Sequence, residues 1–142
     1  MRHFLIPLAL SLAILVPVYA QDASPAASPA KTMSEADKKL ATECLSQAKQ
    51  IALGCRLYAA DNHGKFPDKI EQLIPDYITD ATLFVSPLSP KKEAMGFEYF
   101  GKGGTDSDAP DKILVRSKDL TADGRRIVVY YDCSGKIVAD KQ

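Results

Sequence analysis

The sequence predicts an α+β fold in which one long N-terminal amphipathic helix packs on a small antiparallel β-meander. Two observations predict it. Apolar residues recur at helical spacing over about residues 34–61, and short runs of β-branched and aromatic residues, separated by turn residues, fill the last third of the chain. A helix followed by consecutive strands is the order of an α+β domain, in which the sheet packs on the helix.

The first 20 residues have the organisation of a cleavable signal peptide. A basic start, Met1-Arg2-His3, precedes an apolar run from Phe4 to Val18, and Val18-Tyr19-Ala20 fits the small-x-small rule for signal peptidase. We therefore expect a mature chain that begins at Gln21 and has no transmembrane segment. An uncleaved anchor is the competing interpretation, but the run is shorter than the roughly 20 residues that cross a bilayer, and it contains two prolines.

Residues 21–33 predict a flexible linker, and residues 34–142 predict a single domain. The stretch from Gln21 to Lys31 consists mostly of Ala, Ser and Pro, so it cannot bury enough apolar surface to offset its ordering entropy.

The 18 basic and 18 acidic residues of the chain balance each other. Basic residues are scattered, with tight pairs such as Lys91-Lys92 and Arg125-Arg126, which indicates a solvated surface and no nucleic-acid partner.

The helix is expected from about Ser34 to Asp61. Ser34 can cap it, and the acidic Glu35 and Asp37 favour the positive end of the helix dipole. An apolar stripe then follows at steps of three and four residues, while the charged residues fall mostly off it. The stripe consists of Leu40, Cys44, Ala48, Ile51, Cys55 and Tyr58.

The segment after the helix carries the signals of a helix end and of an irregular connection. Asn62-His63-Gly64 should close the helix, because Asn and Gly accept the left-handed conformation, and Pro67 follows. Asp68-Lys69-Ile70-Glu71 predicts the cap of a brief second helix. Residues 76–90 contain prolines and isolated apolar residues, which predicts an irregular segment held on the core by its aromatics. The brief helix should bury Ile70, Leu73 and Ile74 before Pro75 stops it.

Four strands are expected in the remainder of the chain. The run at residues 126–131 is the strongest strand signal, and Asp132-Cys133-Ser134-Gly135 can turn it back into the last strand. A glycine-rich acidic loop at residues 101–111 separates the first two strands. The expected strands are 97–100, 112–116, 126–131 and 136–139.

Neither a catalytic set nor a cofactor motif is visible in the domain sequence. An enzyme needs a nucleophile with a base, paired carboxylates in a cleft, or a metal cluster. His63 is the only histidine after Ala20, and no Cys-x-x-Cys or His-x-x-x-His partner accompanies it. Gly101-Lys102-Gly103-Gly104 lacks the Lys-Ser/Thr and the helix that complete a phosphate loop. We therefore expect no enzymatic activity and no cofactor.

The helix and the segment after it resemble a known family. Residues 44–53, continued by 57–67, are similar to the long-helix segment of bacterial type IV pilin-like and type II secretion pseudopilin-like domains. Residues 73–78, 84–87 and the last strand-turn-strand continue the similarity in order, so that it covers most of residues 40–140. The motif at the helix end implies a packing role rather than a ligand site. Its residues are Tyr58, Asp61, Asn62, Gly64 and Pro67.

Three departures from the family accompany this resemblance. The usual prepilin leader with its apolar polymerising helix is absent, so we do not expect assembly into a pilus by the usual helix bundle. Ser86 stands where relatives often carry Cys. Cys55 and Cys133 stand where the resemblance implies an apolar residue and a Gly.

These departures bear on the disulfide that an oxidising compartment favours. Cys44 and Cys55 lie about 16 Å apart along one helix, too far for the roughly 4.4 to 6.8 Å between the Cα atoms of a disulfide, so any internal bridge uses Cys133. Cys55 and Cys133 both depart from what the resemblance implies, and a disulfide between them would account for both departures, so we favour this pair. Cys44 then remains a free thiol, because position 86, where relatives often carry Cys, is a serine. A bridge between Cys44 and Cys133, and three free thiols, are the alternatives.

A calcium site is the metal alternative to a solvated acidic loop. Asp106, Asp108 and Asp111 supply carboxylate oxygens, which calcium prefers, and some pseudopilins carry calcium in a late loop. The spacing does not match an EF-hand, and acidic loops between strands are usually solvated, so we expect no bound calcium.

The sequence thus favours a non-catalytic, periplasmic or secreted pseudopilin-like domain. It would act by contact with a protein partner in the cell envelope, as an accessory to a secretion or surface-filament system. A free soluble periplasmic binding or inhibitor module that uses a pilin-like fold is the alternative.

Overall fold

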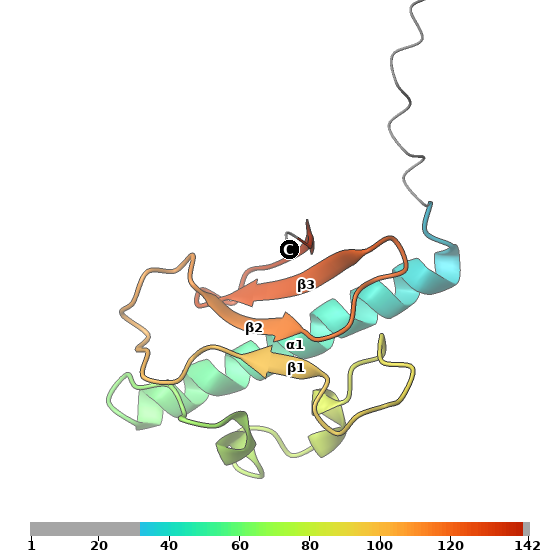
Figure 1. Ribbon diagram of the computed structural model, residues 1–142. Helices are drawn as coiled ribbons and strands as arrows, with labels where there is room; N and C mark the ends of the chain where they lie inside the picture. The colour runs from blue at the N-terminus through green and yellow to red at the C-terminus, as the bar shows by residue number, and fades with distance from the viewer. Residues whose placement is uncertain (1–31, 141–142) are drawn as a thin grey trace, which may run out of the picture.

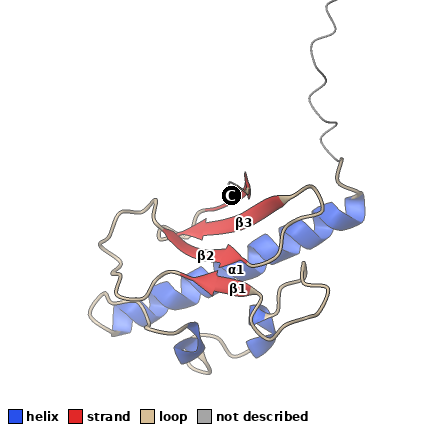
Figure 2. Ribbon diagram, viewed as in Figure 1, coloured by secondary structure: helices blue, strands red, loops and turns tan. Residues whose placement is uncertain are grey.

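α1 runs along one face of a four-stranded antiparallel sheet in the part of the chain that the computed structural model describes, residues 32–140 (Figure 1). The expected signal peptide, and the expected linker up to Lys31, lie outside the described residues. Two short 3₁₀ helices connect α1 to the sheet along its lower side in Figure 2. The α+β class and the meander are therefore confirmed. The elements are α1 (Glu35–Asp61), η1 (Ile70–Leu73), η2 (Ala81–Phe84), β1 (Phe97–Tyr99), β2 (Ile113–Ser117), β3 (Arg125–Tyr130) and β4 (Gly135–Ala139).

α1 begins with the capping box that the sequence indicated. Ser34 Oγ accepts a hydrogen bond from the Asp37 N–H at 3.1 Å, and the Asp37 carboxylate accepts one from the Ser34 N–H at 3.3 Å. A cap of this kind stabilises a helix by about 1 kcal/mol. The expectation of an N-terminal helix needs one correction: α1 is the first described element, but it starts at Glu35 and not at the N-terminus of the chain.

The face of α1 that packs on the sheet is built mainly from small residues. Alanine and cysteine side chains bring the helix axis close to the sheet, and a Cβ atom added to Gly135 of β4 would lie only 2.7 Å from a methyl carbon of Leu45 in α1. Leu40 was expected on this face but is 39% exposed, because the neighbouring Ala41 takes the inward position. The buried residues of α1 are Ala41, Cys44, Ala48, Ile51, Ala52, Gly54, Cys55 and Ala59.

The connection between helix and sheet differs in detail from the expectation. η1 is capped by the Gln72 side chain, whose Oε1 accepts the Lys69 N–H at 2.9 Å, and not by Asp68. Ile74 is exposed, because η1 is a single 3₁₀ turn that turns only Ile70 and Leu73 inward. The segment expected to be irregular contains η2, which Asp80 caps through a 2.8 Å hydrogen bond from the Thr82 N–H.

The strands follow the chain order β1-β2-β3-β4, each antiparallel to the next. Ile127 and Val129 of β3 are fully buried, while Arg126, the residue before Ile127, lies on the opposite face of the sheet. This alternation places one face against α1 and leaves the other to solvent. The hydrophobic core therefore lies in a single layer between the helix and the sheet.

The turn between β3 and β4 contains a residue in the left-handed conformation. The Tyr130 N–H donates to the Ser134 carbonyl and the Cys133 N–H to the Tyr130 carbonyl, both at 2.9 Å, and Cys133 has φ +63°. This is a three-residue hairpin loop with its left-handed position at residue 133, where glycine is favoured. The resemblance implied a glycine at this position.

Candidate functional site

α1 ends in a left-handed turn at His63 and Gly64. Their φ angles are +57° and +79°, whereas Asn62 has φ −117°. Asn62 was expected to adopt the left-handed conformation; instead its side-chain amide donates to the Tyr58 carbonyl at 2.8 Å and so satisfies one of the free carbonyls at the helix end. His63 takes the left-handed position in its place.

The other motif residues hold this helix end against its neighbours. Tyr58 packs edge to face on Tyr77, with 5.4 Å between the ring centroids, and Asp61 Oδ2 accepts the Tyr77 hydroxyl at 3.0 Å. That hydrogen bond to a carboxylate raises the pKa of Tyr77. Pro67 is fully buried, and its carbonyl accepts the Tyr99 hydroxyl at 2.6 Å. All of these contacts are structural.

The glycine-rich loop folds back onto the helix end. The Phe66 N–H donates to the Gly104 carbonyl at 3.0 Å, and the Asp106 N–H donates to the Gly64 carbonyl at 2.8 Å. Lys65 and Thr105 form an isolated antiparallel bridge between them. Two segments that are about 40 residues apart in the sequence are thus fixed side by side.

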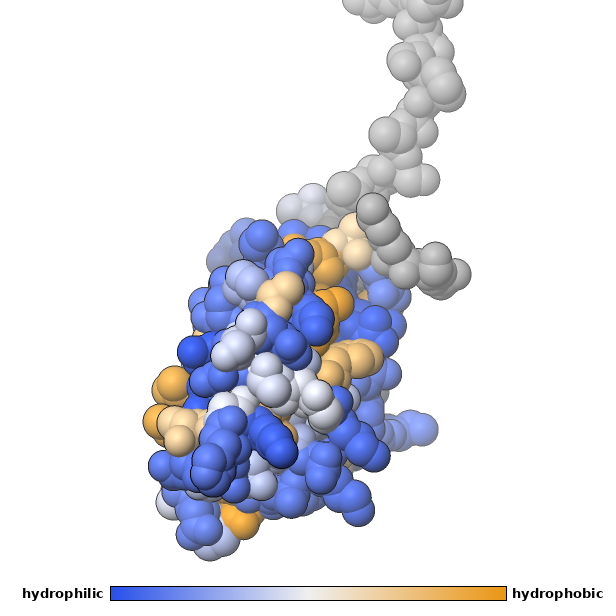
Figure 3. Space-filling view, turned by 90° about the vertical axis from the view of Figure 1, so that its left-hand side faces the viewer, coloured by the Kyte–Doolittle hydropathy of each residue, from blue (hydrophilic) through white to orange (hydrophobic). Residues whose placement is uncertain are grey.

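A pocket of about 520 Å³ opens between these two segments. Aromatic rings of Tyr58 and Phe66 supply its apolar part, and the exposed Lys65 and Asp68 supply charge of both signs. Figure 3 looks onto this end of the molecule, whose surface is mostly hydrophilic with separate apolar residues. The pocket is lined by Tyr58, Asn62, His63, Lys65, Phe66, Asp68, Gly103, Gly104 and Thr105.

The chemistry of this pocket suits binding of a small polar group or of a partner's side chain. Within residues 32–140, His63 makes no hydrogen bond to a hydroxyl or thiol that it could activate as a nucleophile. Of the residues that line the pocket, the sequence motif included Tyr58 and Asn62, but with a packing role, and it assigned no site role to Lys65, Phe66 or Thr105. The bridge that brings residues 65 and 105 together leaves no local signal in the sequence.

The three carboxylates of the acidic loop do not converge. Asp106 lies against Gly64, and Asp108 accepts the Thr105 N–H at 3.2 Å and forms a 3.3 Å ion pair with Lys112, which together lower the pKa of Asp108. Asp111 lies on a different hollow of the surface. The described residues contain no group of three or more Asp, Glu, His or Cys side chains placed to hold a metal ion.

The three cysteines lie on or near the core, and the described part of the chain contains no disulfide. Cys44 Sγ is 3.5 Å from Ser86 Oγ, and burial raises the pKa of the Cys44 thiol to about 11. Burial, followed by the nearby charge of Cys133, raises the pKa of the Cys55 thiol to about 12. Cys133 is half-buried and packs against the core cluster that contains Cys55.

Two leucines are exposed together on the solvent side of α1. Leu53 is 54% exposed and Leu57 49% exposed, and the spacing of four residues places them one turn apart on one face. Ala60, also exposed, continues this row by a further turn. The buried stripe predicted from the sequence does not contain this pair, although an apolar pair off that stripe is visible in the sequence.

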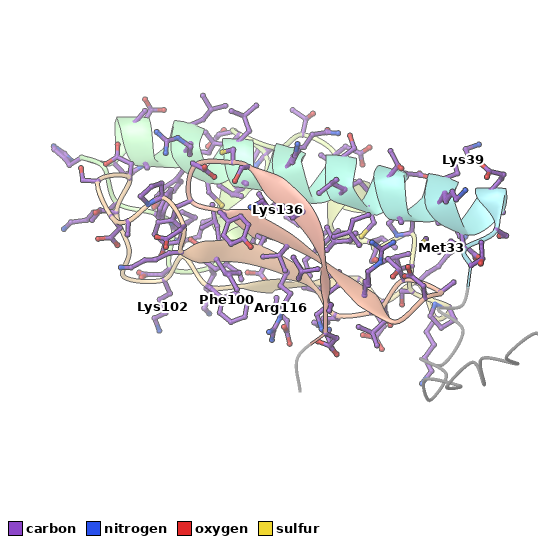
Figure 4. All side chains as sticks on the ribbon, turned by 90° about the horizontal axis from the view of Figure 1, so that it is seen from above. Met33, Lys39, Phe100, Lys102, Arg116 and Lys136 are labelled. Carbon is purple, nitrogen blue, oxygen red and sulfur yellow. The ribbon has the colours of Figure 1, made fainter. Side chains whose placement is uncertain are left out.

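Ion pairs occupy the face of the sheet that points away from α1. Arg116 pairs with Glu98 at 2.6 Å, and its guanidinium also lies 5.1 Å from the centre of the Phe100 ring. Figure 4 shows Phe100 and Arg116 together on this side. Arg126 pairs with Asp140 at 2.7 Å and donates to the Ser117 and Lys118 carbonyls. The arginines of this face are therefore neutralised within the sheet.

Comparison of the chain with protein-family models, with curated proteins and with solved structures finds no match. In the part of the chain that the structure describes, none of the helices has the length and apolar character needed to cross a membrane.

Proposed function

We propose that the chain is an exported, non-catalytic pseudopilin-like domain that acts by contact with a protein partner in the cell envelope. The signal-peptide pattern of residues 1–20 supports export. The long helix on an antiparallel meander supports the pseudopilin-like form of the fold. The resemblance to secretion and filament components supports an accessory role in such a system.

The exposed leucine pair of α1 is the observation that carries the proposal. A helix that docks in a partner's groove presents apolar anchors at i, i+4 and i+7, and Leu53, Leu57 and Ala60 have this spacing. The fold does not use these side chains, because they point away from the sheet. Burying both leucines against an apolar groove would be worth about 2 to 4 kcal/mol.

Site-specific photo-crosslinking in the producing cell tests the proposal. A photoreactive residue at position 53 should form an adduct with an envelope protein, and the additional change Leu57→Glu should abolish that adduct. A photoreactive residue at the exposed polar Thr42, on the same side of α1, is the matched control. Equal adduct yields from positions 42 and 53, or none from either, would contradict a docking role for this face.

The alternative, a free soluble binding or inhibitor module, is favoured by the pocket at the end of α1. Its aromatic part and its charges of both signs are features of small-ligand and peptide sites. Fractionation with a pull-down separates the two proposals. A soluble chain that recovers one soluble partner, and loses it in Lys65→Glu, supports the alternative, whereas recovery with envelope machinery supports the first.

A further inference from the structure

β4 forms an open edge of the sheet. It pairs only with β3, and no residue in the range 32–140 forms a backbone hydrogen bond with its other side. Figure 4 looks down on this edge: the strand that carries Lys136 lies nearest the viewer, and no described helix or strand covers it. An open edge presents unpaired N–H and C=O groups, which are a template for a further strand.

The register of the β3–β4 hairpin identifies the groups that point outward. The hydrogen bond from the Tyr130 N–H to the Ser134 carbonyl makes these two residues the hydrogen-bonded pair that closes the turn. Because hydrogen-bonded and non-bonded pairs alternate in an antiparallel ladder, Lys136 and Val138 bond to β3. The N–H and C=O groups of Gly135, Ile137 and Ala139 therefore point away from it.

This edge is complementary to itself. A two-fold axis at Ile137 would place Gly135 opposite Ala139 of the second copy, so that each outward N–H meets an outward C=O. The side chains that meet on the helix side of the sheet are then two isoleucines flanked by glycine and alanine, which are small enough to allow close approach. On the opposite face, Lys136 would stand opposite Val138 of the second copy, with that copy's Asp140 diagonally adjacent.

The only lysine of β4 does not block the edge. Edge strands are often protected by lysine side chains that point into the path of an incoming strand. The Lys136 ammonium instead lies 5.7 Å from the centre of the Tyr130 ring, on the face of its own sheet. The backbone groups of Gly135, Ile137 and Ala139 are left accessible.

We propose that β4 pairs antiparallel with β4 of a second copy of this chain, about a two-fold axis at Ile137. A symmetric, isologous contact of this kind closes on itself and gives a dimer rather than a fibre. One five-residue strand pair is a small interface, so the association is weak and depends on protein concentration. The proposal is independent of the envelope partner, because it uses a different surface from the leucine pair of α1.

Amide hydrogen exchange of the purified exported chain, measured by NMR at low and at high protein concentration, tests the pairing directly. The amides of Gly135, Ile137 and Ala139 should gain protection as the concentration rises. The amides of Lys136 and Val138 are the internal controls, because they are already bonded to β3 and should be protected at both concentrations. Exchange at the three outward amides that does not change while the chain dimerises would overturn the proposal.

A matched pair of variants gives a second measurement by sedimentation equilibrium. Ala139→Pro removes an outward N–H without touching the β3 ladder, and Ala139→Ser keeps that N–H. The dissociation constant should rise about tenfold or more in Ala139→Pro, as expected for one or two lost hydrogen bonds, and should stay within about twofold in Ala139→Ser. Melting temperatures at low concentration check that both variants fold.

Three outcomes would overturn the dimer through β4. They are a chain that stays monomeric at every concentration, an unchanged dissociation constant in Ala139→Pro, and a dimer that Leu53→Lys abolishes. The last result would assign self-association to the leucine face of α1. Loss of the crosslink from position 53 with the dimer intact would instead contradict the proposed function alone.

Discussion

Cys44 and Ser86 are neighbours in the core although 42 residues separate them in the sequence. The 3.5 Å contact between Cys44 Sγ and Ser86 Oγ joins α1 to the segment after η2, and both side chains are buried. The family resemblance implied a cysteine at position 86. A cysteine at position 86 would therefore lie next to Cys44, close enough for a disulfide between the two side chains.

The change Ser86→Cys should accordingly create a disulfide with Cys44 when the protein is oxidised. A bond that closes a loop of this length constrains the unfolded chain and should raise the free energy of unfolding by about 4 kcal/mol. Denaturant unfolding of the oxidised and reduced variant measures the gain, with Ser86→Cys in a Cys44→Ala background as the control. An oxidised variant that is no more stable than the reduced one would show that the two positions cannot bond.

The pairing of Cys55 with Cys133 stays a prediction for the exported chain. Cys133 packs against the core cluster that contains Cys55. A bridge would fasten the β3–β4 turn to α1 and stabilise the domain by about 3 to 5 kcal/mol. Non-reducing peptide mapping should recover a Cys55–Cys133 peptide; three free thiols, or Cys44 bonded to Cys133, would refute this pairing.

At the scale of elements, the end of α1 depends on a close contact with the glycine-rich loop. Gly64 has φ +79°, and a Cβ atom added to it would lie 2.7 Å from Asp106 Oδ1. Gly103 in the loop has φ +74°, but a Cβ atom there would meet nothing within 4 Å. Both glycines therefore adopt the left-handed backbone conformation, but only Gly64 lies close to another side chain, that of Asp106.

The changes Gly64→Ala and Gly103→Ala separate the two effects. Each should cost about 1 to 2 kcal/mol for the left-handed backbone. Gly64→Ala should cost about 1 kcal/mol more for the displaced Asp106 side chain. Thermal or denaturant unfolding measures both, and an Asp106→Ala background should remove the difference. Equal costs in the wild-type background would mean that the Asp106 contact contributes nothing.

The acidic loop should not bind calcium. Asp108 is already engaged by the Thr105 N–H and by Lys112, and Asp111 points to a different hollow. Added calcium should leave the melting temperature unchanged, whereas an ion bound at a hundred times its dissociation constant would add about 2.7 kcal/mol. A rise of several degrees that a chelator reverses would establish the site.

The elements with regular periodicity could be predicted from the sequence, and the contacts between distant segments could not. The cap at Ser34, the span of α1 and the four strands follow from local patterns that specify their own hydrogen bonds. The inward rotation of Ala41 instead of Leu40 depends on how the sheet sits on α1. The pocket at the helix end depends on the bridge between Lys65 and Thr105, which is a tertiary contact.

At the scale of the whole molecule, the core lies in a single layer between α1 and the sheet. Both α1 and the sheet also have a surface that the core does not cover. α1 presents Leu53 and Leu57 to solvent on its outer side, while the sheet leaves the β4 edge open. These two surfaces lie on different elements, so an envelope partner and a second copy can bind at the same time. The proposed contact with an envelope partner requires that the folded domain be exported.

The mass of the mature chain tests this requirement most directly. We predict that protein recovered from the periplasmic or secreted fraction begins at Gln21, because Val18-Tyr19-Ala20 fits the signal-peptidase rule. Intact-mass and N-terminal peptide analysis of that fraction gives the answer, with the cytoplasmic fraction of the same cells as the control. A chain that retains Met1, or that is found only in the cytoplasmic fraction, would contradict the account.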